Sequence, residues 1–126
     1  MNEFHYDAES DPPAPVCDVV LIVPATDLRV SAPAIVDTGA DGMIVPVGHL
    51  HRIGARRVFK TGMRSQWGER RAVYLYLIDV QIGSITLPGV YAVGDELGTE
   101  VILGRNVLNR LRVLLDGPAA LTRIQV

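Results

Sequence analysis

The side chains best suited to chemistry lie close together in the segment Asp37-Thr38-Gly39-Ala40-Asp41, between two apolar runs. A carboxylate beside buried apolar surface is costly unless it is hydrogen-bonded or takes part in a reaction. Gly39 allows the backbone to turn sharply and another group to approach closely, and the small Ala40 leaves room beside it. The Thr38 hydroxyl group could hold the loop in place. The segment therefore predicts an acidic loop between two strands, with Asp37 as the candidate catalytic residue.

Histidine and cysteine give weaker indications of a site. His49 and His51 are two residues apart and could nominally belong to a metal site, but neither a cysteine nor a third ligand stands near them. We therefore predict surface histidines, no metal site and no other cofactor. Cys17 is the only cysteine, so no intrachain disulfide can form, and its apolar neighbours predict a small core residue.

Length and composition predict one globular domain. The chain has 126 residues, of which 48% are apolar and 21% are charged, as in soluble globular proteins with a hydrophobic core. No amino-terminal signal pattern is present, and no apolar run approaches the roughly 20 residues that a membrane span needs. We therefore expect a cytoplasmic protein with no membrane segment in this chain.

Basic residues are concentrated in one stretch, although the net charge is only −2. Residues 52–71 contain seven basic side chains against Glu69 alone. Such a cluster can mark a nucleic-acid face, but no aromatic ladder or binding motif accompanies it. A solvated, arginine-rich hairpin is the favoured interpretation, so we predict no nucleic-acid partner. The basic residues are Arg52, Arg56, Arg57, Lys60, Arg64, Arg70 and Arg71.

The elements that must position the acidic loop are short. Eight prolines and twelve glycines favour many brief strands joined by turns, which predicts an all-β fold. Residues 1–15 are acidic and proline-rich and are expected to form a flexible arm, followed by one domain over residues 16–126. A helix is predicted over residues 105–111, and residues 48–54 are expected to form one helical turn or a bend. Strands are predicted over residues 16–23, 28–36, 43–47, 56–61, 71–82, 84–93, 101–103, 112–115 and 120–126.

Two segments together resemble a known family. The loop Asp37–Asp41 and the segment Gly104-Arg105-Asn106, which lies between apolar residues, resemble the two signatures of the retroviral-type aspartic proteases, the retropepsins. Their order and separation fit, and the hairpin between them stands where the family places its flap. The resemblance spans about residues 16–115. It implies a retropepsin-like closed barrel or sandwich with a flap hairpin and one short C-terminal helix, active as a homodimer.

The resemblance also implies roles for individual residues. Arg105 would pair with Asp41 in a buried, bidentate ion pair that holds the helix against the loop, so Asp41 would be structural. Thr38 would bridge the loops of two subunits. Trp67 could contact substrate or stabilise the hairpin, and both interpretations are open. The flap residues expected near substrate are Met63, Gln66, Trp67 and Gly68.

A single Asp-Thr-Gly per chain bears on function. Amide hydrolysis by this route needs two carboxyl groups, one acting as a base toward water and one protonated. The second Asp37 must then come from a second copy of the chain. The prediction is an aspartic endopeptidase that cleaves a peptide or protein substrate. The alternatives are a retropepsin-fold module that binds peptide or dimerises with little catalysis, and, with weaker support, a nucleic-acid binder using the basic hairpin.

The C-terminal end of the chain is open to one more interpretation. The last predicted strand could fold back as a hairpin after Asp116.

Overall fold

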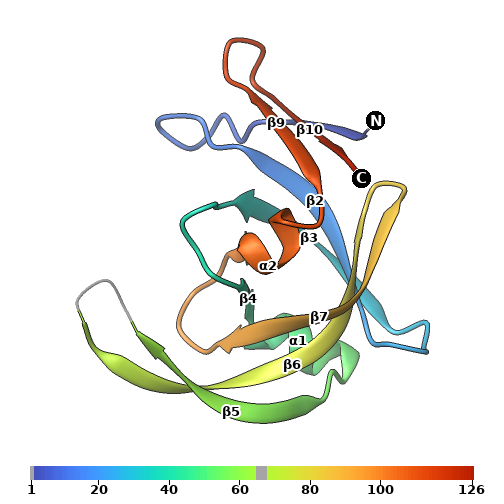
Figure 1. Cartoon of the computed structure of the whole chain (residues 1–126), viewed down its shortest axis with the longest axis vertical. Helices are drawn as coiled ribbons and strands as arrows, with labels where there is room; N and C mark the ends of the chain where they lie inside the picture. Colours follow the sequence, from blue (N-terminus) through green and yellow to red (C-terminus); the bar gives the residue numbers. More distant parts are fainter. Residues whose placement is uncertain (1, 65–67) are drawn as a thin grey trace.

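The computed structural model describes residues 2–64, with only the backbone of Arg64, and residues 68–126. These residues form strands and two short helices (Figure 1). The strands are β1 (Asn2–His5), β2 (Val16–Ile22), β3 (Arg29–Val36), β4 (Met43–Pro46), β5 (Arg57–Arg64), β6 (Arg70–Ile82), β7 (Ile85–Asp95), β8 (Val101–Leu103), β9 (Arg112–Asp116) and β10 (Leu121–Gln125). The helices are α1 (Val47–Ile53) and α2 (Arg105–Leu108).

Six of the strands close into a barrel. The larger sheet has the order β2-β3-β8-β4-β7-β6-β5, and β2 also pairs with β6, which closes the ring from β2 to β6. Inward-facing side chains fill the barrel, and Leu21, Ile78, Val80 and Leu103 are fully buried. Closure leaves these strands without free edges. The prediction of an all-β fold with a closed barrel is confirmed.

A long hairpin extends from the barrel. Strand β5 pairs with β6 and, among the described strands, with no other (Figure 1). The register runs from Arg57 opposite Tyr76 to Arg64 opposite Arg70. The two strands therefore form the flap hairpin expected between the two sequence signatures.

A smaller sheet joins the two ends of the described chain. Its order is β1-β10-β9, and all neighbours are antiparallel. The flexible arm expected over residues 1–15 is therefore wrong for β1, because Phe4 packs against the core and Glu3 pairs with Arg123 at 3.2 Å. The prolines that suggested an arm begin at Pro12, after this strand ends, and so do not interrupt it. The C-terminal segment folds back as a hairpin, as the sequence allowed.

The prediction of a single helix is also wrong. Helix α1 packs Leu50 and Ile53 into the core and ends at Gly54, whose left-handed φ of 73° favours glycine. Two buried residues in seven give little helical periodicity, which explains why the sequence left this segment ambiguous. Helix α2 ends at Leu108, earlier than expected. Among the described residues, no helix combines the length and apolar character that a membrane crossing requires.

Cys17 lies on β2 and is fully buried. Burial, with a smaller contribution from the neighbouring Asp18 carboxylate, raises the pKa of the Cys17 thiol to about 12. We expect a thiol reagent at pH 8 to label the unfolded chain and leave the folded protein unlabelled, as followed by mass spectrometry. Rapid labelling of the native protein would contradict this burial.

The same shift predicts a loss of stability at alkaline pH. The folded-state pKa lies above the ordinary value of 9.0, so the unfolded chain releases this proton first as the pH rises. The contribution of Cys17 to stability is therefore complete below about pH 9 and declines as the pH rises toward 12. Denaturant unfolding at several pH values measures the decline, and Cys17→Ala should remove this component.

Candidate active site

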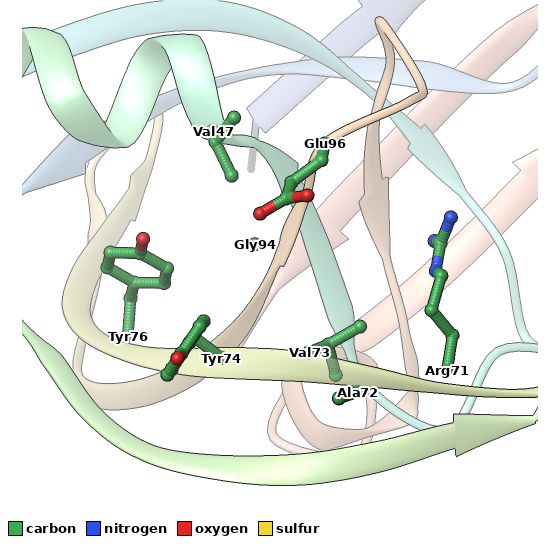
Figure 2. A pocket seen from close by; sticks show the side chains of 8 residues that line it. All are labelled: Val47, Arg71, Ala72, Val73, Tyr74, Tyr76, Gly94 and Glu96. Carbon is green, nitrogen blue, oxygen red and sulfur yellow. The ribbon is translucent and has the colours of Figure 1, made fainter.

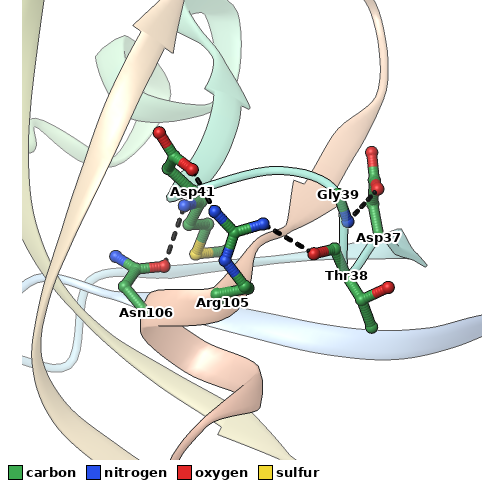
Figure 3. A network of polar contacts seen from close by, with 7 residues as sticks. Asp37, Thr38, Gly39, Asp41, Arg105 and Asn106 are labelled. Carbon is green, nitrogen blue, oxygen red and sulfur yellow. Dashed lines mark hydrogen bonds and ion pairs between the residues drawn. The ribbon is translucent and has the colours of Figure 1, made fainter.

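The acidic loop connects the end of β3 to the start of β4, beside the end of β8. Strands β3 and β8 are parallel, with Val36 opposite Leu103. The Asp37 amide continues this pairing and donates to the Leu103 carbonyl at 3.1 Å. The Gly39 amide donates to Asp37 Oδ1 at 2.9 Å, so one carboxylate oxygen is held by the loop's own backbone (Figure 3). Asp37 is half-buried at the rim of the barrel, and its carboxylate has a defined orientation.

The start of α2 fastens the other side of the loop. The Arg105 amide donates to the Ala40 carbonyl at 2.9 Å, and the Asn106 amide donates to the Asp41 carbonyl at 3.2 Å. The two segments that resembled family signatures are therefore in direct contact, although more than sixty residues separate them in sequence.

The Arg105 side chain divides its hydrogen bonds between two partners. Its Nη1 donates to the Thr38 carbonyl at 2.8 Å, and its Nη2 pairs with Asp41 Oδ1 (Figure 3). The expected buried, bidentate pair is wrong for the single chain, because 43% of the Arg105 side chain and 94% of the Asp41 side chain are exposed. The guanidinium group spans the loop and links both ends of it. An exposed pair of this kind adds little stability.

Asn106 is a structural residue of the site to which sequence reasoning assigned no role. Its Oδ1 accepts from the Met43 amide at 2.9 Å, and its Nδ2 donates to the Tyr91 carbonyl at 2.9 Å. The side chain therefore ties α2 to β4 and β7. The available signal was its place directly after Arg105 in the second segment. An amide side chain at that place can both donate and accept hydrogen bonds, so it can link two other segments.

We expect Asn106→Ala to lower the free energy of unfolding by about 1–2 kcal/mol, because both hydrogen bonds are lost. Denaturant unfolding measures this change. Exposed Asn109, at the end of the same helix, provides the matched control. Asn109→Ala should change stability by no more than about 0.5 kcal/mol. Equal changes in unfolding free energy for the two substitutions would show that the two hydrogen bonds of Asn106 add no stability of their own.

Gly104 brings the helix and the loop into backbone contact. A Cβ atom at this position would lie 2.8 Å from the Gly42 amide nitrogen and closer still to the Gly42 carbonyl. Real Cβ atoms do not approach backbone this closely, so the packing of α2 on the loop requires glycine at position 104. The backbone conformation of Gly104 is ordinary, with φ −91°, and the requirement comes from the close approach alone.

A largely apolar cleft of about 550 Å³ runs between the acidic loop and the flap hairpin. The loop forms one wall through Gly39, Ala40, Asp41 and Gly42. The remaining lining residues come from β4 to β7 and α2: Ile44, Thr61, Gly62, Met63, Val73, Leu75, Tyr91, Val93 and Asn106. Half the surface of Phe59 is exposed, and its ring packs against Tyr91 at 5.6 Å between centroids. A cleft of this size and character suits an extended apolar ligand.

The flap residues predicted to contact substrate have different outcomes. Met63 lines the cleft. Gly68 lies two residues before β6 and has a left-handed φ of 85°. Gln66 and Trp67 lie outside the described residues, so their roles stay predictions.

A second, smaller hollow of about 80 Å³ lies on the opposite face of β6 (Figure 2). Tyr74 and Tyr76 line it together with Val47 and Glu96. Tyr76 is only 3% exposed and packs closely on Gly94, as expected for a packing residue. Tyr74 is more exposed and carries the Arg57 guanidinium 4.4 Å from its ring centroid. No residue of the acidic loop lines this hollow. The contacts of Tyr74 and Tyr76 brace the base of the flap hairpin.

The chain matches the family described as "gag-polyprotein putative aspartyl protease" over residues 29–110, more than half of its length. No curated protein matches the chain. Similar solved structures include a retropepsin-like aspartic protease from Rickettsia conorii, with 15% identity, a TM-score of 0.59, and coverage of 99% of this chain and 94% of that one.

Two further structures are similar in fold. The retroviral protease-like domain of Ddi1 from Leishmania major is 20% identical, with a TM-score of 0.55 and coverage of 88% of this chain and 89% of that one. The EIAV protease complexed with the inhibitor HBY-793 is 21% identical, with a TM-score of 0.55 and coverage of 85% and 93%. At these identities, the structural likeness establishes the fold alone.

Proposed function

Because this chain belongs to the retropepsin-like aspartyl protease family, we propose that it is an aspartic endopeptidase that works as a homodimer. The observation that carries the proposal is the placement of Asp37. Its half-buried carboxylate is held by Gly39 at the end of β3, and the loop that carries it forms a wall of the apolar cleft.

The chemistry needs two carboxyl groups, and each chain supplies one Asp-Thr-Gly loop. In the dimer, the ionised Asp37 takes a proton from a water molecule, whose oxygen attacks the scissile carbonyl carbon. The Asp37 of the other copy is protonated and donates its proton to the carbonyl oxygen as charge develops there. The tetrahedral intermediate then transfers a proton to the amide nitrogen, and the C–N bond breaks.

The cleft determines the form of substrate that fits. An extended peptide can lie as a strand between the acidic loop and the flap hairpin, with alternate side chains facing the apolar walls. Leu75, Val93 and Ile44 line these walls and favour apolar side chains beside the scissile bond. Met63 and Gly62, on the hairpin, lie over the peptide from the other side.

A peptide library incubated with the wild-type protein at mildly acidic pH tests the proposal. Mass spectrometry should detect internal cleavage, and the rate per chain should rise with protein concentration as dimers form. The Asp37→Asn variant is the matched control for contaminating proteases. Equal cleavage by both proteins would contradict the assignment.

A further inference from the structure

A hollow outside the cleft lies where one edge of β6 changes its partner strand. Strand β5 pairs with this edge as far as Tyr76, and β2 pairs with it from Asp79 onward (Figure 1). Strand β7 occupies the other edge. Leu77 therefore lies at a gap between β5 and β2, where no described strand pairs with this edge. The hollow at the gap, called the distal hollow here, has a volume of about 450 Å³ and is lined by Val23, Pro24, Arg56, Arg57, Val58 and Leu77.

The distal hollow and the cleft lie on the same face of β6. Alternate residues of a strand share a face of the sheet, and so do residues directly opposite each other on paired strands. Leu75 is opposite Phe59 on β5 and Val93 on β7, and Leu77 is opposite Tyr91 on β7. Leu75 lines the cleft, and Leu77 lines the distal hollow. The two sites are therefore neighbours, about 7 Å apart along β6.

Apolar surface connects the two sites. Phe59 and Tyr91 come from the strands on either side of β6, and their ring centroids are 5.6 Å apart, so the rings meet over β6. Both residues are about half exposed. A peptide that leaves the cleft can thus cross these two rings and reach the distal hollow within about two or three extended residues.

Arg56 supplies the positive charge at the distal hollow. Its side chain is exposed, and no acidic residue in the described part of the chain forms an ion pair with it. The guanidinium group of Arg57 lies elsewhere, 4.4 Å from the ring centroid of Tyr74. Tyr74 is adjacent to Leu75 and so faces the other side of β6. An unpaired guanidinium group beside an apolar hollow suits a ligand that has a carboxylate next to an apolar side chain.

We propose that the distal hollow is a second substrate-binding site, which recognises an apolar residue followed by an acidic residue beyond the part of the substrate held in the cleft. The apolar side chain enters the hollow beside Leu77 and Val58, and Arg56 binds the carboxylate. This inference rests on the proposed function, because it concerns the specificity of the same substrate chain. A homodimer has two such hollows, related by its twofold axis.

Two peptides that differ only in charge test the proposal. Both have the same apolar centre and are extended at each end by a glycine, a leucine and a charged residue, which is glutamate in one peptide and lysine in the other. The wild type should cleave the glutamate peptide with a KM about fivefold lower and a similar kcat, because contacts far from the scissile bond bind substrate and transition state equally. Serine in place of the terminal leucines should raise KM about tenfold.

Charge reversal at Arg56 tests which residue makes the distinction. Arg56→Glu should reverse the preference, so that the lysine peptide has the lower KM, and the melting temperature should stay near the wild-type value. Lys60→Glu is the matched control, because Lys60 is exposed on β5 but is opposite Tyr74 and so lies on the other face. It should keep the preference for glutamate. A wild type without any preference, an unchanged preference in Arg56→Glu, or equal reversal by both variants would overturn the proposal.

Direct binding separates this inference from the proposed function. The same peptides, labelled with fluorescein, should bind the Asp37→Asn variant with dissociation constants that differ about fivefold by fluorescence anisotropy, and Asp37→Asn with Arg56→Glu should reverse the order. This result, together with no cleavage by the wild type, would support the distal hollow and overturn the protease assignment. Cleavage of both peptides with equal KM, and equal dissociation constants, would overturn the distal hollow and leave the protease assignment intact.

Discussion

Asp37→Asn is expected to lower the rate of peptide cleavage by about three orders of magnitude or more, because both copies of the variant lack an ionisable group at the reacting water. Asparagine keeps an oxygen that can accept the Gly39 amide, which Asp37 Oδ1 accepts at 2.9 Å, so the loop should keep its shape. Steady-state cleavage of a peptide identified from the library measures the loss. The melting temperature should stay within a few degrees of the wild-type value. Asp27→Asn, in an exposed turn, is the matched control and should leave the rate unchanged.

Mixing the inactive variant with the wild type tests whether the site is shared. At a fixed amount of wild-type chain, an excess of Asp37→Asn chains converts active dimers into mixed dimers with a single Asp37. Activity should fall to about half with an equal amount of variant, and to about a tenth with a roughly ninefold excess. The mixture must be studied at concentrations where the dimers exchange subunits. If the cleavage rate stayed unchanged in an excess of the variant, one chain would complete the site by itself.

Gly104→Ala should lower the free energy of unfolding by about 3 kcal/mol or more. The added methyl group meets backbone atoms of Gly42 rather than the end of a flexible side chain, so α2 and the acidic loop must move apart. That movement lengthens the hydrogen bonds from the Arg105 and Asn106 amides to the loop carbonyls. Stability and activity should therefore fall together, and denaturant unfolding with a parallel cleavage assay measures both.

Gly48→Ala is the matched control for this substitution. Gly48 lies in α1, and a methyl group added there would have no neighbouring atom within 4 Å, so alanine meets no obstacle. Alanine also favours the helix, and the substitution should raise stability by about 0.5–1 kcal/mol. If Gly104→Ala unfolded at the same denaturant concentration as the wild type, that result would contradict the close packing of α2 against the loop.

The local parts of this protein could be predicted from its sequence. Asp37-Thr38-Gly39 is a turn with its own internal hydrogen bond, and the polar residues that begin α2 directly follow the short apolar strand β8. Alternating apolar residues on β6, such as Ile78, Val80 and Ile82, predict a half-buried strand wherever its neighbours lie. These features depend on a few adjacent residues, and the structure agrees with them.

The parts that depend on distant partners could not be predicted in the same way. Strand β1 gains its stability from β10, more than a hundred residues away, and nothing within Asn2–His5 indicates that partner. The exposure of Arg105 likewise follows from how α2 sits on the loop, whereas the resemblance to the retropepsins implied a buried pair. Asn106 acts through Met43 and Tyr91, two residues that only the fold brings to it.

The distance along the chain between the acidic loop and its anchors has a consequence during protein synthesis. Thr38 and Arg105 are 67 residues apart, and the ribosome makes the loop, α1 and the whole flap hairpin before it adds β8 and α2. Contacts between such distant residues form late in folding. A nascent chain that ends before β8 thus carries Asp37 without the Leu103 carbonyl or the Arg105 guanidinium that shape its loop. Translation therefore keeps the site unassembled until most of the chain has been made.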